Sequence, residues 1–354
     1  MRQPLAAKPS GRLGTVRATA EVAVLKVEVS SVGSGDGAAL SEAGDRVLRH
    51  RPGPPVRGWR RRGQHLALGL RAATVVTRHL PERTRYWLAD IVGHVAHLLA
   101  RRRAAIAAEN YVTFTHGDRR AAVRLTRRAF VNYARTVTDF LVLDRLLDQL
   151  VRSTPPPATE PLRRELARGR AAIVVTPHFG NWDLGAAVTA TCGRPVHAVA
   201  DQFGPPAVDE LVRATRERLG VRIISAGPAS AREALRALHR GDVLCLAADI
   251  DKSGAGVAVR FLGRSVSFPA GPAILALRTG AALIPGYVRR LPGQGHEAVL
   301  WNPIEVPSEG SSEARVQAMT QGMAESFEAM IRLDPSQWFA FHHLGSGRPR
   351  VGAG

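Results

Sequence analysis

The chain has 354 residues, enough to bury one large core or two smaller ones, and its 45% hydrophobic and 22% charged residues are typical of a globular protein. Lys and Arg number 49 against 30 Asp and Glu, a net charge of +19, which favours an anionic partner such as nucleic acid or a membrane face. The two cysteines, Cys192 and Cys245, exclude a disulfide framework and fit a reducing cytoplasm.

Residues 1–55 are dominated by Gly, Ser, Ala and Pro, a composition that predicts a disordered amino-terminal extension. The first residues contain no charged region followed by an apolar one, so no signal peptide is predicted. Residues 346–354 are expected to form a short tail.

Residues 56–150 are predicted to form a helical, amphipathic region that associates with membranes. The mostly apolar run 66–76 is shorter than the roughly 20 residues that a spanning helix needs. Apolar residues then recur at helical spacing through 87–99, and arginines cluster at 60–62 and 101–103. This pattern is typical of helices lying in a membrane interface, and equally of helices packed on the domain.

Residues 151–345 alternate short apolar runs with helical segments, which predicts an α/β fold with a central sheet flanked by helices. The expected strands are 171–175, 195–199, 221–224, 243–248, 257–261, 282–288 and 296–302. The expected helices begin near 184, 208, 229, 270 and 313, and several end at a glycine.

The first of these strands is followed by His178, with Asp183 five positions further on. Five extended residues span roughly 16 Å, and on a regular helix the two side chains would lie about 140° apart. Only a tight strand-to-helix loop, which Gly180 permits, would bring them together. An imidazole fixed by a carboxylate is a general base. The alternative is that Asp183 caps the helix and His178 is an ordinary loop histidine.

Two further groups of residues follow apolar strands. Asp249 and Asp251 could hold a divalent metal and a sugar-nucleotide phosphate, as in many glycosyltransferases, or could be two solvated carboxylates of a turn. The Gly- and Pro-rich passage 261–272 leads into a helix and contains Arg264, which suits a phosphate or an oxyanion. Its alternative is a structural loop.

Taken together, these residues resemble the bacterial lipid A biosynthesis acyltransferase family, over roughly residues 65–343. The resemblance rests on the stretch His178-Phe179-Gly180-Asn181-Trp182-Asp183, on Ala248-Asp249-Ile250-Asp251, on Phe261-Leu262-Gly263 with Pro269-Ala270-Gly271-Pro272, and on Pro335-Ser336-Gln337-Trp338, with Arg103 and Asn110. The wording of the central motif is similar to the actinobacterial phosphatidylinositol mannoside branch. That branch commonly has a Glu where Arg264 stands here.

The resemblance implies a glycerolipid-acyltransferase-like sheet and transfer of a fatty acyl chain to a lipid-linked hydroxyl at the cytoplasmic membrane face, with peripheral attachment. His178 would be the base and Asp183 its partner, and acyl-CoA or acyl-carrier protein would donate the chain without cofactor or metal. The residues that it implies for substrate binding are Asn181, Asp249, Asp251, Gly263, Arg264, Pro269 and Gly271.

Two alternatives of other classes stay open on the sequence. One is a metal-dependent glycosyltransferase that uses Asp249 and Asp251. The other is a non-enzymatic, Arg-rich nucleic-acid binder, which the lack of zinc ligands and the position of the basic clusters beside apolar helices disfavour. No nucleic acid is therefore expected among the partners.

Overall fold

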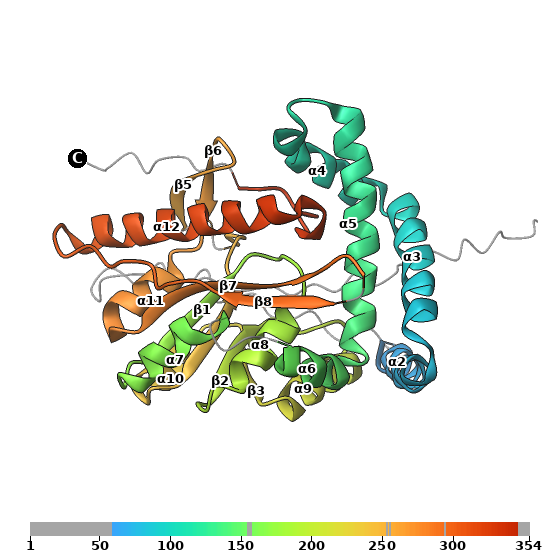
Figure 1. The fold of residues 1–354 in the computed structure, drawn as a ribbon, viewed down its shortest axis with the longest axis horizontal. Coiled ribbons are helices and arrows are strands. Elements are labelled where there is room, and N and C mark those ends of the chain that lie inside the picture. Colours follow the sequence, from blue (N-terminus) through green and yellow to red (C-terminus); the bar gives the residue numbers. More distant parts are fainter. Residues whose placement is uncertain (1–58, 154–157, 253, 255, 294, 346–354) are drawn as a thin grey trace, which may run out of the picture.

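The computed structural model describes residues 59–153, 158–252, 254, 256–293 and 295–345 (Figure 1). The predicted amino-terminal extension, 1–55, and the tail, 346–354, lie outside the described residues. The fold confirms the predicted α/β class, with a central, mostly parallel sheet flanked by helices.

The main sheet has six strands in the order β3-β2-β4-β1-β7-β8. Five of them run parallel, and β8 pairs antiparallel with β7. Because β1 lies between β4 and β7, the loop after β1 opens near the centre of the sheet. The strands are β1 (Ala172–Thr176), β2 (Val196–Ala200), β3 (Val221–Ser225), β4 (Val243–Ala247), β7 (Ala282–Arg290) and β8 (His296–Leu300).

Both faces of the sheet are covered by helices, as its continuous apolar strands require. Alternate residues of β1 divide between the faces: Ile173 and Val175 join the core beneath α10, α11 and α12, whereas Ala172 and Val174 join the core beneath α7. The helices of this region are α7 (Glu160–Ala167), α8 (Trp182–Ala190), α9 (Pro206–Arg218), α10 (Ser230–His239), α11 (Gly271–Thr279), α12 (Ser312–Leu333) and the 3-10 turn η3 (Pro335–Gln337).

The amino-terminal helices stand at one end of the sheet. In Figure 1, α3 and α5 run side by side, with α2 near the base of α3. Asp118 begins α5 by accepting hydrogen bonds from the backbone N–H groups of Arg120 and Ala121. These elements are α2 (Trp59–His79), α3 (Glu82–Leu99), α4 (Arg101–Tyr111), η1 (Val112–Thr115), α5 (Arg119–Phe140) and α6 (Leu143–Ser153).

A hairpin outside the main sheet follows β4. Strands β5 (Val257–Phe261) and β6 (Arg264–Phe268) pair antiparallel as a separate two-stranded sheet. Leu262 and Gly263 form its turn with φ of 52° and 71°, the left-handed values that a tight hairpin turn needs. The sequence predicted β5 but not β6, whose Arg-Ser-Val-Ser-Phe run has only two buried positions, Val266 and Phe268.

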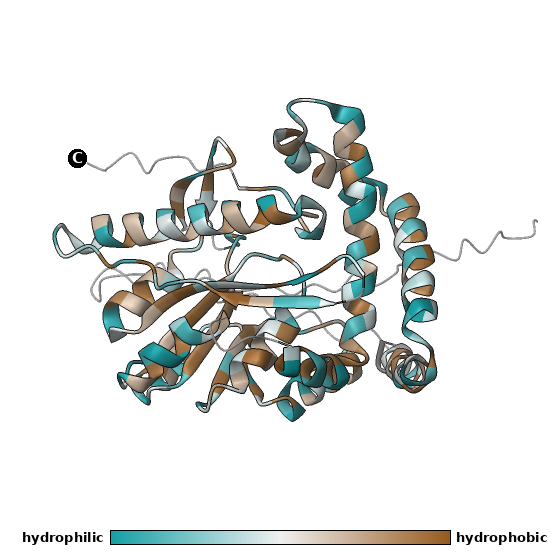
Figure 2. Cartoon of the chain, in the orientation of Figure 1, coloured by the Kyte–Doolittle hydropathy of each residue, from teal (hydrophilic) through white to brown (hydrophobic). Residues whose placement is uncertain are grey.

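Hydropathy follows the layers. Figure 2 shows hydrophobic residues concentrated along the central strands, while the surrounding helices mix hydrophilic and hydrophobic faces. Among the residues that the structure describes, no helix combines the length and the apolar character that crossing a bilayer demands.

Candidate active site

The register of β1 and β4 places His178 opposite Asp249. Thr176 is the register partner of Ala247, and the ladder continues with a 2.9 Å hydrogen bond from the Ala248 N–H to the Thr176 carbonyl. His178 lies two residues after Thr176, and Asp249 lies two residues after Ala247. Their side chains therefore meet at the carboxyl edge of the sheet, where His178 Nδ1 lies 2.6 Å from Asp249 Oδ1.

Asp249 is held as a buried carboxylate. Its side chain is fully enclosed, and its second oxygen accepts a 2.9 Å hydrogen bond from the indole N–H of Trp338. Burial alone would raise its pKa, but the adjacent His178 and the Trp338 hydrogen bond outweigh it and lower the pKa to about 2. At neutral pH Asp249 is thus ionised and accepts a hydrogen bond from the Nδ1–H of His178, which leaves the lone pair of the imidazole on Nε2.

The loop that carries His178 is fixed by backbone hydrogen bonds from distant segments. The Phe339 N–H donates to the His178 carbonyl at 2.8 Å, and the Gly180 N–H donates to the Gln337 carbonyl at 2.9 Å. Gly180 has a φ of 61°, and a Cβ there would collide with the carbonyl oxygen of Val288. The predicted requirement for glycine at this turn is confirmed. The carboxy-terminal segment thereby becomes part of the site.

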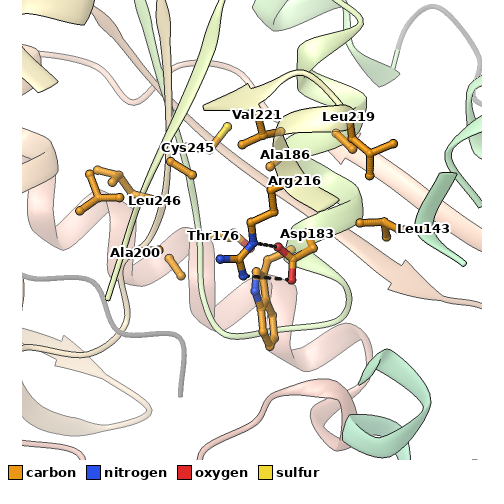
Figure 3. Close-up of a pocket in the computed structure, with 15 residues that line it drawn as sticks. Leu143, Thr176, Asp183, Ala186, Ala200, Arg216, Leu219, Val221, Cys245 and Leu246 are labelled. Atoms are coloured by element: carbon orange, nitrogen blue, oxygen red, sulfur yellow. Dashed lines mark hydrogen bonds and ion pairs between the residues drawn. The ribbon is translucent and has the colours of Figure 1, made fainter. Parts of the chain in front are cut away.

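Asp183 does not contact His178. It lies in the first turn of α8, and its Oδ1 accepts a 2.7 Å ion-paired hydrogen bond from Arg216 Nε of α9 (Figure 3). The predicted contact between Asp183 and His178 is therefore wrong, because the helix directs this carboxylate to the neighbouring helix. The alternative, in which Asp183 caps α8, is also wrong. The capping residue is Asn181, whose side-chain oxygen accepts a hydrogen bond from the Leu184 N–H at 3.0 Å.

The other residues that the sequence singled out occupy separate places. Asp251 accepts from the Gly256 N–H at 2.9 Å and the Ser267 hydroxyl at 2.5 Å, and so ties the loop after β4 to the hairpin. Gly263 and Arg264 are exposed at the hairpin turn. Pro269 and Gly271 are buried where α11 begins. Their predicted roles in substrate binding stay predictions.

A buried ionic network that no sequence pattern indicates lies beside the His178 loop. Asp139 of α5, fully buried, accepts from the Tyr86 hydroxyl at 2.9 Å, from Asn181 Nδ2 at 3.3 Å and from Arg290, and lies 3.2 Å from His296 Nε2. Burial raises its pKa, but His296 and Arg290 together lower it below the usual value. Asp139 thus ties α3, α8 and β7 together with its charge compensated.

Aromatic rings surround His178. Its ring centroid lies 5.6 Å from that of Trp182 and 6.3 Å from that of His342. An apolar pocket is lined by Trp182, Val221 and Leu246, the last two of which are labelled in Figure 3. A second pocket lies between α3 and α5 against Phe341. The first pocket is lined by Trp182, the neighbour of His178, and the second by Phe341, which adjoins His342 in the chain.

The fold and this site define an α/β protein in which the His178–Asp249 pair, at the carboxyl edge of the sheet, can take a proton from an incoming hydroxyl. The family model described as bacterial lipid A biosynthesis acyltransferase matches residues 63–344. That range contains His178, Asp249 and Trp338, and the chain belongs to this family.

Curated relatives share part of their length with the chain. It is 34% identical over 176 residues to the phosphatidylinositol mannoside acyltransferase of Mycolicibacterium smegmatis, covering 49% of this chain and 56% of that protein. It is 32% identical over 176 residues to the protein of the same name from Mycobacterium tuberculosis, covering 49% and 54%. The alignment thus spans about half the length of each relative.

Proposed function

We propose that the protein is an O-acyltransferase that moves a fatty acyl chain from a thioester to a hydroxyl of a glycolipid or phospholipid. The observation that carries this proposal is the His178–Asp249 pair, whose 2.6 Å contact leaves the lone pair of the imidazole on Nε2. Family membership and the two apolar pockets, one lined by Trp182 and the other by Phe341, support a lipid substrate.

In this mechanism His178 Nε2 takes the proton of the acceptor hydroxyl as its oxygen attacks the thioester carbonyl. Asp249 stabilises the resulting imidazolium and keeps the ring oriented, and the Trp338 indole holds Asp249 in place at 2.9 Å. A thioester is already activated toward attack, so acyl-CoA or acyl-carrier protein would serve as the donor. The names of the relatives support a phosphatidylinositol mannoside as acceptor.

The metal-dependent glycosyltransferase has no observation in its favour. Asp249 is engaged by His178 and Trp338, and Asp251 accepts hydrogen bonds from Gly256 and Ser267. Both carboxylates are thus committed to protein donors rather than turned toward one shared point.

The decisive experiment incubates the purified protein with labelled acyl-CoA, and in parallel with the same acyl chain on acyl-carrier protein, plus a total polar lipid extract. The expected product is an acylated glycolipid or phospholipid, identified by mass analysis, that requires His178 and is formed in the presence of a metal chelator. Sugar transfer in its place, or unchanged product with His178→Ala, would contradict the proposal.

We also propose that the protein sits peripherally on the cytoplasmic face of the membrane through α3. One face of this helix exposes a continuous set of large apolar side chains, here called the α3 apolar face: Trp87, Leu88, Ile91, Val92, Val95, Leu98 and Leu99. Trp87 is 61% exposed and Leu98 67%. The surplus of basic residues favours an anionic surface, with each basic group near it contributing about 1 kcal/mol.

Cosedimentation with vesicles of phosphatidylcholine and phosphatidylglycerol measures this attachment. Binding is expected to fall at high salt and to weaken strongly when Trp87 and Ile91 are both replaced by Asp. Val123→Asp is the matched control, because Val123 is also 49% exposed but belongs to α5. Equal binding of all three proteins would show that the α3 apolar face is not the contact surface.

A further inference from the structure

A buried imidazole nitrogen beside His178 is without a hydrogen-bond partner among the residues that the structure describes. This nitrogen is Nε2 of His342, and the two imidazole centroids are 6.3 Å apart. Buried polar groups are almost always paired, because leaving one unpaired costs about 1–3 kcal/mol. An unpaired one at a reaction centre is a site for a group that arrives with the substrate.

His342 is held in place from two sides. Asn110 of α4 donates through Nδ2 to the His342 carbonyl and to the Ala340 carbonyl, both at 2.9 Å. Three residues before His342, the Phe339 N–H donates to the carbonyl of His178 itself at 2.8 Å. The backbone segments that carry the two imidazoles are thus held together by short hydrogen bonds, which favours a preorganised site.

The charge state of His342 suits a donor rather than a second base. Burial lowers its pKa, and although Asp249 opposes this effect, His178 and Lys252 reinforce it, so that the pKa is about 4. The imidazole is therefore neutral at pH 7 and offers one N–H. A neutral imidazole can polarise a carbonyl without competing for the proton that His178 must accept.

We propose that His342 is a further catalytic residue, whose Nε2–H donates to the thioester carbonyl oxygen as that oxygen becomes an oxyanion. The inference rests on the proposed acyl transfer and adds the group that stabilises the negative charge. It also accounts for the Asn110 hydrogen bonds, which position the segment rather than contact the substrate.

The hydroxyl oxygen bonds to the carbonyl carbon, its proton passes to His178 Nε2, and the carbonyl electron pair moves onto the oxygen that His342 contacts. When that pair returns, the carbon–sulfur bond breaks and the thiolate takes the proton from His178. The products are an ester and a free thiol.

Three variants of His342 test the proposal in the acyl-transfer assay, with both donors. His342→Ala and His342→Phe are expected to lower kcat by about 10²–10³-fold, the usual effect of removing one oxyanion donor, with KM little changed. His342→Gln should recover part of kcat, because its amide supplies an N–H. His343→Ala is the matched control: the next residue is exposed, and its kcat should equal that of the wild type.

Melting temperatures separate catalysis from folding. If kcat follows the melting temperature across the three variants, or if the well-folded Phe variant keeps wild-type kcat, His342 is structural and the inference fails. Wild-type and His178→Ala proteins run in the same assay. Absence of wild-type transfer would overturn the proposed function and this inference together, whereas His178-dependent transfer that ignores His342 would overturn the inference alone.

Discussion

Two of the buried histidine–aspartate pairs in the described part of the chain lie at opposite edges of the same sheet. His178 and Asp249 follow β1 and β4 at the carboxyl edge, whereas His197 lies at the start of β2 and Asp242 just before β4, at the amino edge. Both pairs are enclosed, with side-chain exposures of 8% and 0% for the first and 9% and 7% for the second.

The partners of the two carboxylates differ. Asp249 receives a neutral indole N–H from Trp338, so its negative charge remains available to an imidazolium. Asp242 receives a guanidinium, with Arg240 Nη2 at 2.8 Å, and its charge is already compensated. The histidine of the first pair lies beside the rings of Trp182 and His342, and Trp182 also lines an apolar pocket. A close histidine–aspartate contact is therefore not evidence of chemistry by itself; sheet edge, charge balance and access decide.

Replacing each histidine by alanine gives the largest expected contrast. His178→Ala should lower acyl transfer by about 10²–10⁴-fold or more, because the general base is lost, and should leave the melting temperature nearly unchanged. His197→Ala should keep kcat within a few-fold of the wild type and lose about 1–3 kcal/mol of unfolding free energy. Rates and chemical denaturation of both variants measure this. Comparable rate losses in His178→Ala and His197→Ala would contradict the assignment of chemistry to His178 alone.

Replacing Asp249 should lower the rate and replacing Asp242 should not, and the effect should be smaller than that of replacing His178. Asp249→Asn removes the charge that stabilises the imidazolium and should reduce kcat by about 10²-fold or more. Asp242→Asn should leave kcat intact, since its charge already serves Arg240. Steady-state kinetics at pH 7 with the same donor and acceptor provide the measurement. Full activity of the Asp249→Asn protein would show that His178 works without its partner.

Asp183 is expected to matter for stability rather than chemistry. Asp183→Asn breaks the ion pair with Arg216 between α8 and α9, in which the side chains are only 15% and 9% exposed. The loss should be about 1.5–3 kcal/mol of unfolding free energy, with kcat within a few-fold of the wild type. A rate loss as large as that of Asp249→Asn, in a stable protein, would restore Asp183 to the catalytic site.

The smallest effect is a pH dependence that the Asp249→Asn variant should lack. In the fold the pKa of Asp249 is lowered from 3.8 to about 2. A lowered pKa stabilises the fold above the unfolded value, and that stabilisation disappears as pH falls through the folded value. The wild-type advantage over the variant should thus shrink by about 2 kcal/mol between pH 5 and pH 2. If the difference in unfolding free energy between the wild type and the variant stays constant from pH 5 to pH 2, the pKa of Asp249 does not contribute to stability in this way.

Much of the fold could be read from the sequence, but strand order could not. The apolar runs predicted β1 and β4, and the residues after each were recognised as candidates. Their adjacency was not predictable, because the chain passes through β2 and β3 between them. The sequence alone favours Asp183 as the partner of His178, because the two are only five positions apart. The first turn of α8 instead directs it to Arg216, and the register of β1 with β4 brings Asp249 to the histidine.

The contacts of the carboxy-terminal segment with the site could not be predicted from sequence patterns either. In the sequence Trp338 is only the last residue of a terminal motif, and no periodicity indicates that its indole will hold a carboxylate after β4. Trp338 is itself fixed, since the Tyr111 hydroxyl donates to its carbonyl. Long-range hydrogen bonds between irregular segments have no sequence period, so the structure alone revealed them.

Residues 337–342 contact the His178 loop and Asp249, and this has a consequence for biosynthesis. The segment that braces the His178 loop and supplies the donor to Asp249 is among the last parts of the family-matched region to leave the ribosome. The sheet can assemble on a nascent chain, since its final strand ends at Leu300. The site cannot, since Trp338 and Phe339 contact Asp249 and His178, so the proposed acyl transfer must await translation of the final segment.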